Sequence, residues 1–417
     1  MSEIKNLEPK IVWEIFDEIT KVPRPSKKEG KIIAWLEGFA KKHDLEYKKD
    51  AIGNIVMFKS ATPSMKGRPA VILQSHMDMV CEKNSDTTFD FDNDPKEAYI
   101  EGEWVKARGT TLGADDGIGM AAQLALLVSE GIEHPDIEAL FTVDEETGLT
   151  GAFNLGDDML TGKYLINLDS EDEGEIFIGC AGGVDTQAFF HYRRMPVPDG
   201  LVWMRAEITG LKGGHSGDNI NDGLANSNKL LARLLLEGSR SYGLCLRMFD
   251  GGNLRNAIPR EAHALFGIEA GKAGEFRQFT EKLAAEIEAE YKYTDPGIKL
   301  TLREESAPED FVIDPDTQLR LLQAIQGVTN GVIAMSYSMP GLVETSTNLA
   351  SVKFSTANTI VITTSQRSSV ESAKKNAADT VSSVFRLAGA EVEQSDGYPG
   401  WAPDPNSHLL KAAKESY

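Results

Sequence analysis

One pattern occurs three times in this sequence, in Ala70-Val-Ile-Leu-Gln-Ser-His-Met-Asp78, in Ile137-Glu-Ala-Leu-Phe-Thr-Val-Asp-Glu-Glu146 and in Tyr164-Leu-Ile-Asn-Leu-Asp169. Each stretch begins as a short apolar run and ends abruptly in polar residues, which is typical of a buried strand that stops at the edge of a sheet. Helical segments such as residues 118–128 lie between the runs. Apolar runs that alternate with helices predict a three-layer α/β domain, with a largely parallel sheet covered on both faces.

The chain upstream of the first run predicts two amphipathic helices and a hairpin. Apolar residues form one stripe over residues 12–19 and another over residues 32–39, and a breaker, Pro23-Arg-Pro-Ser26, separates the two helices. Residues 45–59 are typical of a β-hairpin with Gly53-Asn54 as its turn. We expect these elements to belong to the same α/β domain.

The pattern changes after the glycine-rich segment Ile178-Gly-Cys-Ala-Gly-Gly183. From Leu201 to about Glu393 the expected strands alternate polar and apolar residues and are followed by long amphipathic helices, which indicates an α+β layer with one solvated sheet face. The strand–helix–strand order of residues 253–305 recurs over residues 348–395, although few residues are identical, and suggests an internal duplication. Residues 405–417 predict the beginning of a further helix.

Composition narrows the class of protein. A chain of 417 residues is long enough for two or three domains of ~100–200 residues each. The formal net charge is −21 and no run of basic residues exceeds two, which argues against nucleic acid and anionic membrane as partners. Three scattered cysteines suit a reducing compartment. The N-terminus lacks the apolar core of a signal peptide, and no apolar stretch approaches the ~18 residues of a membrane span, so we expect a soluble, cytoplasmic protein.

Carboxylates and one histidine follow the three apolar runs and begin one helix. Because the carboxyl ends of neighbouring parallel strands open onto one crevice, we expect these side chains to converge there. Each group alone is more often a polar strand end, a solvated acid or a helix cap. Together, so many acids need a positive partner, which a pair of divalent cations would supply. The set is His76, Asp78, Asp115, Asp116, Glu145, Glu146 and Asp169.

The residue types indicate how such a site could work. A histidine ligand needs an acceptor for its second ring nitrogen, and Asp78 is a candidate two residues after His76. The adjacent acids Glu145 and Glu146 can divide two tasks, one binding a cation and the other acting as a general base. Two cations ~3.5–4 Å apart acidify a shared water and polarise a carbonyl oxygen, which indicates hydrolysis of an amide or ester.

Competing motifs are weak. Gly117-Ile-Gly-Met-Ala-Ala122 matches the G-x-G-x-x-A dinucleotide pattern, but it follows Asp115-Asp116 instead of an apolar strand. Those acids would lie where a pyrophosphate should bind, so we expect the match to be coincidental. The sequence contains no G-x-S-x-G elbow and no G-x-x-x-x-G-K-[ST] loop, which argues against an α/β-hydrolase or a P-loop enzyme.

Five motifs, in the order SHMD, TTLGADDGIG, TVDEETG, NLDSEDEG and GGHSG, resemble the M20 class of di-metal peptidases. The resemblance is closest to the Xaa-His dipeptidase branch and continues through NLRNAIP, GLVETSTNLA and SQRSS. It implies an α/β catalytic domain over residues 1–184, an inserted α+β lid over residues 185–395, and the beginning of a return to the catalytic domain over residues 396–417.

The resemblance also assigns roles to single residues. It implies two divalent ions, with His76 and Asp169 as ligands, Asp115 as the bridge and Glu146 completing the sites. It makes Glu145 the general base and Asp78 the residue that orients His76. In the lid, His215 of GGHSG would stabilise the oxyanion, and Asn256 and Arg367 would contact the substrate, the arginine through a terminal carboxylate. Without the resemblance, His215 is better explained as a turn residue, and an ordinary helix-start arginine explains Arg367 equally well.

One part of the family pattern is missing. The family has a further metal-binding histidine in a GxHSPDE-like segment near its C-terminus, whereas the last histidine of this sequence is His408, in PDPNSHLLKAAKESY. We therefore expect a fragment or a truncated gene product, with one ligand of the second metal absent and part of the sheet uncovered.

The sequence thus predicts metal-dependent hydrolysis of dipeptides, with a preference for the Xaa-His type. Zn²⁺ is the expected metal, with Mn²⁺ and Co²⁺ as alternatives, because mixed imidazole and carboxylate ligands suit all three. Two other functions stay open: hydrolysis of N-acyl amino acids by the same mechanism, and a non-catalytic protein that binds metal or peptide. A small peptide is the expected partner, and a homodimer is possible.

Overall fold

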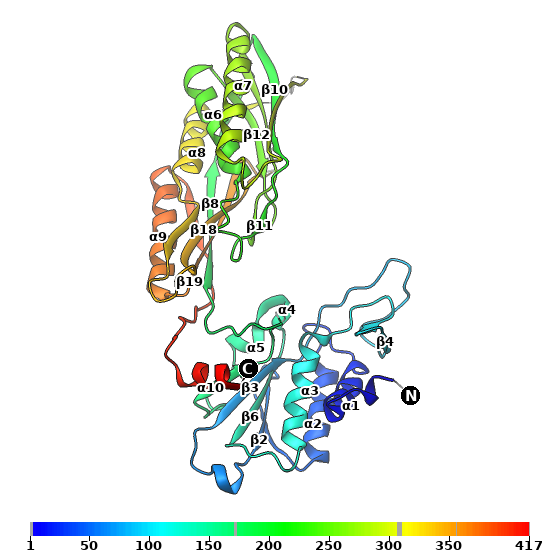
Figure 1. Cartoon of the computed structure of the whole chain (residues 1–417). Helices are drawn as coiled ribbons and strands as arrows, with labels where there is room; N and C mark the ends of the chain where they lie inside the picture. Colours follow the sequence, from blue (N-terminus) through cyan, green and yellow to red (C-terminus); the bar gives the residue numbers. More distant parts are fainter. Residues whose placement is uncertain (1–2, 171–172, 307–310, 356, 417) are drawn as a thin grey trace. The chain divides into compact units, whose positions relative to one another are not determined.

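The computed structural model describes residues 3–170, 173–306, 311–355 and 357–416 (Figure 1). The chain divides into two compact units, Met1–Ile176 and Phe177–Tyr417. The domain limits expected from the sequence, at residues 184 and 395, stay predictions. None of the helices in the described ranges combines the length and the apolar character needed to cross a membrane.

The first unit is an α/β layer. Helices α1 (Lys10–Thr20), α2 (Gly30–Lys42) and α3 (Ala114–Val128) lie on one face of its main sheet (Figure 1). Their apolar stripes form one core with alternate residues of the strands, including Phe16, Leu36, Leu124 and Phe141. The two amphipathic helices and the hairpin expected before residue 60 are present, because their apolar residues match the helical and strand periods.

The five strands of this sheet are ordered β1-β2-β6-β3-β7. Strand β3 lies between β6 and β7 and runs parallel to both. Strand β2 is antiparallel to β1 and to β6. The expected largely parallel sheet is therefore correct only for β6, β3 and β7. The short turn of the β1-β2 hairpin allows only an antiparallel pair, and β2 in turn joins β6 in the antiparallel direction. The strands are β1 (Glu46–Lys49), β2 (Ile55–Lys59), β3 (Val71–His76), β6 (Ile137–Thr142) and β7 (Tyr164–Asn167).

The opposite face of the sheet has a thinner cover than expected. A small apolar cluster of Val56, Ile72, Leu140 and Met159 lies there, with Leu155 and Leu160 beside it. These last residues come from the segment after two single-turn helices, α4 (Glu145–Gly148) and α5 (Thr150–Phe153). A short segment, and not a long helix, therefore covers this face within the described part of the unit.

A β-hairpin that we did not expect interrupts the unit between β3 and α3. Its strands are β4 (Ala98–Glu101) and β5 (Trp104–Ala107), and they pair only with each other in a two-stranded sheet. Each strand has four residues and carries charged side chains, so the sequence contains too little periodicity to identify them. Within the described ranges the chain also forms the short 3₁₀ helices η1 (Glu3–Asn6), η2 (Pro63–Met65) and η3 (Ala270–Lys272).

The second unit is built on a nine-stranded antiparallel sheet ordered β15-β10-β14-β12-β18-β19-β8-β20, with β17 paired to β18. Long helices, labelled α6, α7, α8 and α9, lie along one face of the sheet (Figure 1). The strands are β8 (Gly182–His191), β10 (Leu201–Thr209), β12 (Cys245–Gly251), β14 (Ala262–Glu269), β15 (Lys299–Glu304), β17 (Gly331–Met335), β18 (Val343–Phe354), β19 (Thr359–Ser368) and β20 (Glu391–Gln394). The four helices are α6 (Ser227–Ser241), α7 (Ala273–Glu290), α8 (Pro315–Gly327) and α9 (Glu371–Leu387).

The two halves of this sheet share one topology. The first half runs β10-α6-β12-β14-α7-β15, and its strands are ordered fourth, first, third, second. The second half runs β8-α8-β18-β19-α9-β20 and has the same order of strands. Each half is a ferredoxin-like βαββαβ unit, and the halves meet where Gly251 of β12 pairs with Val352 of β18. This shared order supports the expected duplication, which stays a prediction at the level of sequence.

The α+β character expected of the second region is confirmed. Residues of β10 alternate between buried and partly exposed positions, and the buried ones, such as Met204 and Ile208, pack with Leu231 of α6 and Phe385 of α9 in one core. Short strands β9 (Arg194–Met195), β11 (Gly214–His215), β13 (Ala257–Ile258) and β16 (Val312–Ile313) form two small two-stranded sheets, and helix α10 (His408–Ser416) follows β20.

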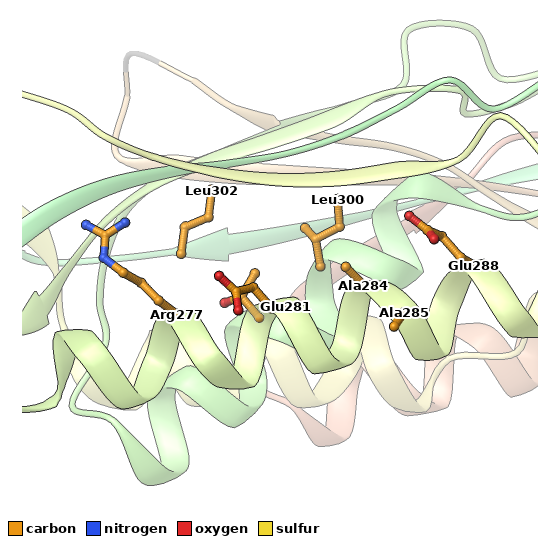
Figure 2. A pocket seen from close by; sticks show the side chains of 8 residues that line it. Arg277, Glu281, Ala284, Ala285, Glu288, Leu300 and Leu302 are labelled. Carbon is orange, nitrogen blue, oxygen red and sulfur yellow. The ribbon is translucent and has the colours of Figure 1, made fainter.

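A surface groove of this unit lies between α7 and β15. Figure 2 shows Arg277, Glu281 and Glu288 of the helix facing Leu300 and Leu302 of the strand. None of the residues that line it belongs to the set expected to carry chemistry. The groove is therefore not the candidate active site.

Candidate active site

The expected convergence occurs at the carboxyl ends of β6, β3 and β7, three adjacent parallel strands. His76 is the last residue of β3, and Glu145 and Glu146 begin α4 directly after β6. Asp169 follows β7 by two residues, and Asp115 lies in the first turn of α3. Four segments that are far apart in the sequence thus contribute to one site.

Distances show how tightly the groups cluster. The Nε2 atom of His76 lies 2.8 Å from Oδ1 of Asp115, 3.7 Å from Oδ1 of Asp169 and 4.0 Å from Oε2 of Glu145. The His76 side chain is fully buried, whereas that of Asp115 is 42% exposed. The buried imidazole is therefore surrounded by carboxylates, and Asp115, the expected bridging ligand, is open to solvent.

The donor set fits a divalent metal. Ligand atoms of His76, Asp115 and Glu146 lie within 4.8 Å of one another, and so do those of His76, Glu145 and Asp169. Imidazole combined with carboxylate oxygens is a ligand set for first-row divalent ions such as Zn²⁺ and Mn²⁺. Glu145 belongs to the group that contains Asp169, and Glu146 belongs to the group that contains Asp115. Either glutamate is therefore close enough to the other donors to share a metal ion with them.

Asp78 organises the site from below. Its Oδ1 lies 3.3 Å from Nδ1 of His76, at ion-pair distance although outside hydrogen-bond geometry. The same carboxylate accepts hydrogen bonds from the backbone N–H groups of Glu145 at 3.0 Å and Glu146 at 3.3 Å. Burial acts to raise the pKa of Asp78, but His76 and these donors lower it to about 2. Asp78 thus links the histidine to the start of α4 as a permanent anion.

The neighbouring acids are held at high proton affinity. Burial raises the pKa of Asp169 to about 7, and it also raises the pKa of Glu145 and of Glu146. Burial lowers the pKa of His76, but Asp78, Asp169 and Asp115 outweigh it and raise the value to about 10. Several carboxylates crowd around one imidazolium, and a bound cation would neutralise their excess negative charge.

The glycines of the dinucleotide-like motif leave room for neighbouring side chains. A Cβ on Gly119 would lie 2.1 Å from Oδ1 of Asp116, and the Gly119 N–H donates to that oxygen at 3.1 Å. A Cβ on Gly117 would lie 2.6 Å from Nη2 of Arg24. Burial raises the pKa of Asp116 to about 8. The motif therefore accommodates Asp116 and Arg24, in agreement with the expectation that the match is coincidental.

Sequence reasoning missed three residues that lie beneath the site. The breaker between α1 and α2 predicts only the end of a helix. Arg24 and Ser26 within it, and Glu29 shortly after it, nevertheless all bond to segments that carry site residues. The available signal was the presence of five polar or charged residues in the short connection over residues 23–29, where the two prolines alone would suffice to end the helix.

The second unit brings its three expected residues together. His215 pairs with Ala257 between β11 and β13, and the backbone oxygen of Asn256 accepts a hydrogen bond from Ser216 at 2.8 Å. A Cβ on Gly217 would lie 3.2 Å from Nδ1 of His215 and 3.4 Å from Nη1 of Arg367. His215 also lies 2.8 Å from Oδ2 of Asp218.

Arg367 is positioned by an aromatic partner. It lies on β19 opposite Gly183 of β8, and its Nη1 donates to the hydroxyl of Tyr398 at 3.2 Å. A Cβ on Gly183 would lie 2.7 Å from the Tyr398 ring, so only glycine leaves room for it. Neither Gly183 nor Tyr398 was singled out for this contact from the sequence.

The remaining expected features lie elsewhere. His408 is exposed at the start of α10, and none of the possible metal-ligand groups among the described residues includes it. Glu171 and Asp172 of the NLDSEDEG motif lie outside the described residues.

Residues 72–417 match the description "Peptidase family M20/M25/M40", and the chain belongs to this family of peptidases. Over its full length the chain is 42% identical to the cytosol non-specific dipeptidase of Escherichia coli (strain K12), and it spans 86% of that protein. The crystal structure of aminoacylhistidine dipeptidase from Vibrio alginolyticus superposes with a TM-score of 0.94 at 40% identity, over 99% of this chain and 84% of that one. A tripeptidase from Staphylococcus aureus shares the fold, at 17% identity, a TM-score of 0.50, and coverage of 98% and 81%.

These comparisons confirm the resemblance drawn from the five motifs, and with it the α/β fold and the assignment to a family of peptidases. The clustered histidine and carboxylates agree with metal-dependent chemistry. The roles of individual site residues stay predictions.

Proposed function

We propose that this protein is a cytoplasmic metallo-dipeptidase that hydrolyses small peptides, including those of the Xaa-His type. One observation carries the proposal: His76, Asp115, Glu145, Glu146 and Asp169 cluster at one sheet edge in a chain that is 42% identical to a dipeptidase throughout. The relative from Escherichia coli is described as a cytosol non-specific dipeptidase, and the one from Vibrio alginolyticus as an aminoacylhistidine dipeptidase.

His76, Asp115, Glu146 and Asp169 would hold two divalent ions in this proposal, with Asp115 contributing to both sites. Zn²⁺ is the proposed metal, and Mn²⁺ or Co²⁺ suits the same ligands. When bound, the ions supply an acidified water and polarisation of the scissile carbonyl. Asp78, whose Oδ1 lies 3.3 Å from Nδ1 of His76, is the proposed residue that orients the His76 ring.

Glu145 is the proposed general base. Its carboxylate takes a proton from the attacking water and returns it to the leaving amine, so that a neutral amine departs. Burial raises the pKa of Glu145, which makes its carboxylate a stronger base than an exposed glutamate. The backbone hydrogen bond from Glu145 to Asp78 holds the start of α4 in place while the side chain is free to move the proton.

In the second unit, His215 is the proposed oxyanion stabiliser, and Asn256 and Arg367 are the proposed substrate contacts. The guanidinium of Arg367 is suited to a terminal carboxylate because its planar fork can donate two parallel hydrogen bonds. A homodimer is also proposed, because β15 and β20 are the outer strands of their sheet and could pair with a second copy.

The test compares purified protein on Xaa-His dipeptides, other dipeptides and N-acetyl amino acids, with the ion content of the same preparation measured. We expect dipeptide hydrolysis and about two tightly held ions per chain. Turnover of N-acetyl amino acids alone would replace the proposed substrate, and one ion or none without hydrolysis would indicate a binding protein. Light scattering tests the dimer.

A further inference from the structure

A short connection, residues 23–29 (Pro-Arg-Pro-Ser-Lys-Lys-Glu), lies between α1 and α2, beneath the candidate metal centre. Its Arg24 is fully buried, which is rare for an arginine and costly unless the guanidinium is well paired. The proposed mechanism does not use this connection. Its contacts nevertheless reach three of the segments that carry metal-site residues.

Arg24 bridges two of these segments. Its Nη1 donates to the backbone oxygens of Met77 at 3.1 Å and Asp78 at 2.5 Å, just after His76 at the end of β3. Its Nη2 donates to the backbone oxygen of Gly113, two residues before Asp115. A Cβ on Gly113 would lie 2.7 Å from this Nη2. One side chain therefore fixes the spacing between the segments that present His76 and Asp115.

Ser26 adds a second tie to the end of β3. Its Oγ donates to Oδ2 of Asp78 at 2.8 Å, and Asp78 is the carboxylate that faces His76 and receives the N–H groups of Glu145 and Glu146. The backbone of Pro25 also forms a bridge with Met79. The connection therefore holds both the main chain and the side chain at this position.

Glu29 reaches the third segment. Its Oε1 accepts hydrogen bonds from the backbone N–H groups of Lys27 at 2.8 Å and Asp144 at 3.0 Å. Asp144 immediately precedes the two glutamates of the site and has a left-handed backbone, with a φ of 51°. A fixed acceptor at this point stabilises the turn from which Glu145 and Glu146 project.

Charge explains why an arginine occupies the centre of the connection. Asp78, Asp116 and Asp115 surround its guanidinium, and their attraction opposes the effect of burial, which lowers the pKa of Arg24 to about 10. The side chain therefore remains cationic at neutral pH and offsets part of the acid excess of the site. Three donors in a fixed fork can address carbonyls on two segments, which a lysine cannot do.

We propose that residues 23–29 form a clamp that sets the geometry of the metal centre, with Arg24, Ser26 and Glu29 as positioning residues. Residues that hold the ligands in place determine how tightly an ion binds, and removing one typically weakens metal affinity ~10–100-fold. The inference rests on the metal centre of the proposed function, but it is independent of which substrate is cleaved.

The first test uses Ser26→Ala, which removes the hydroxyl that holds Asp78. Mn²⁺ affinity of the full-length, ion-free protein is measured by calorimetry, together with its melting temperature. We expect Mn²⁺ to bind ~10–100-fold more weakly than to the parent. The matched control is Ser129→Ala, because Ser129 is also partly buried in this unit and its hydroxyl donates to the backbone oxygen of Ala125. The backbone oxygen of Ser129, which accepts from Nζ of Lys59 at 2.7 Å, is kept in this variant. The control should bind Mn²⁺ like the parent while lowering the melting temperature by a similar amount.

A second pair of variants separates the hydrogen bond from general packing. Glu29→Ala removes the acceptor for the Asp144 N–H and should weaken Mn²⁺ binding, whereas Glu29→Gln keeps an oxygen at that place and should restore it. Arg24→Lys keeps the charge but loses the fork, and we expect it to weaken binding as well. If Arg24→Lys does not fold, the serine and glutamate variants still decide the question.

The clamp is wrong if Ser26→Ala and Glu29→Ala bind Mn²⁺ as tightly as the parent, if Ser129→Ala weakens binding equally, or if Glu29→Gln fails to restore it. These outcomes are measured without substrate. A parent that binds Mn²⁺ but cleaves no dipeptide would refute the proposed function and leave the clamp in place, whereas a parent that binds no ion would refute both.

Discussion

In the proposed mechanism, single side chains divide the chemistry of the site. Glu145 and Glu146 are adjacent, and each has a carboxylate oxygen within 4.8 Å of a ring nitrogen of His76. Only one of the two glutamates can serve as a free base. Asp78 receives both of their N–H groups, so the backbone does not distinguish them. The division of labour must therefore be measured through the side chains.

Changing Glu145 to Gln keeps the shape of the side chain and removes its basicity. Because a positioned general base typically contributes ~10²–10⁴-fold to the rate, we expect kcat to fall by about that factor. The ion content per chain should stay near that of the parent. Steady-state kinetics and metal analysis of the same sample check both quantities. Glu146→Gln is the matched control and should lose an ion; the reverse result would exchange the two roles.

The pH dependence of the ion-free protein tests the charge state of His76. Its pKa is raised to about 10, against about 6.5 for an unperturbed histidine, so the folded state binds the proton more tightly. The resulting stability is fully present below about pH 6.5 and is lost as the pH rises through about 10. We expect the difference in unfolding free energy between the parent and His76→Gln to shrink over this range. Urea unfolding at several pH values measures it, and a constant or growing difference contradicts the assignment.

The convergence of the acids and His76 followed from the sequence because polar residues at the ends of parallel strands meet at one edge. Their individual roles as ligand, bridge or base were implied only by the resemblance to the family. The pattern could not identify Arg24 or Tyr398. Arg24 bonds to backbone oxygens, and Tyr398 contacts a glycine and an arginine that are far away in the sequence. Contacts of this kind depend on the folded positions of segments and leave no periodic signal.

The length of each helix and strand decided whether it could be predicted from the sequence. Long amphipathic helices and the β1-β2 hairpin were predictable because their periods extend over many residues. The direction of β2 relative to β6 was not, because pairing is decided by neighbours distant in the sequence. The β4-β5 hairpin was missed because four-residue strands carry too few positions to show alternation.

The pairing of β8 with β19 offers a test of close packing between elements. Gly183 of β8 lies opposite Arg367 of β19. The backbone of Gly183 also pairs with that of Tyr398: the Gly183 N–H donates to the Tyr398 oxygen at 3.1 Å, and the Tyr398 N–H donates to the Gly183 oxygen at 2.8 Å. Gly183→Ala places a Cβ 2.7 Å from the Tyr398 ring, so we expect a loss of ~1–3 kcal/mol in the free energy of unfolding. Urea unfolding measures this value.

A glycine in the same unit provides the control for that substitution. Gly274 lies in helix α7, and a Cβ added there would meet nothing within 4 Å. Gly274→Ala should stabilise the protein by up to about 1 kcal/mol, because alanine favours the helix. Equal effects of the two substitutions would show that the Tyr398 ring does not occupy the space beside Gly183.

At the level of the whole chain, two units have separate cores, and the proposed ion ligands all belong to Met1–Ile176. The α/β and α+β characters of the two regions were predictable from the change of pattern after Gly183. The shared topology of the two sheet halves became visible only from strand order, because strand pairing follows backbone geometry while the side chains of the halves have diverged.

Ion binding should therefore stabilise the chain unevenly. A ligand that binds only the folded state adds RT ln(1 + [L]/Kd), or about 2.7 kcal/mol at a hundredfold excess over Kd. We expect this gain to slow hydrogen exchange of backbone amides in β3, β6 and β7, because the proposed metal-binding residues lie at or after the ends of these strands. Exchange there requires the site to open. Amides of β10 and β14, in the core of the second unit, should exchange at the same rate with and without ion. Hydrogen–deuterium exchange with mass spectrometry, in Mn²⁺ and after chelation, measures both sets. Equal protection of both sets, or protection of β10 and β14 alone, would contradict an ion site built from the first unit.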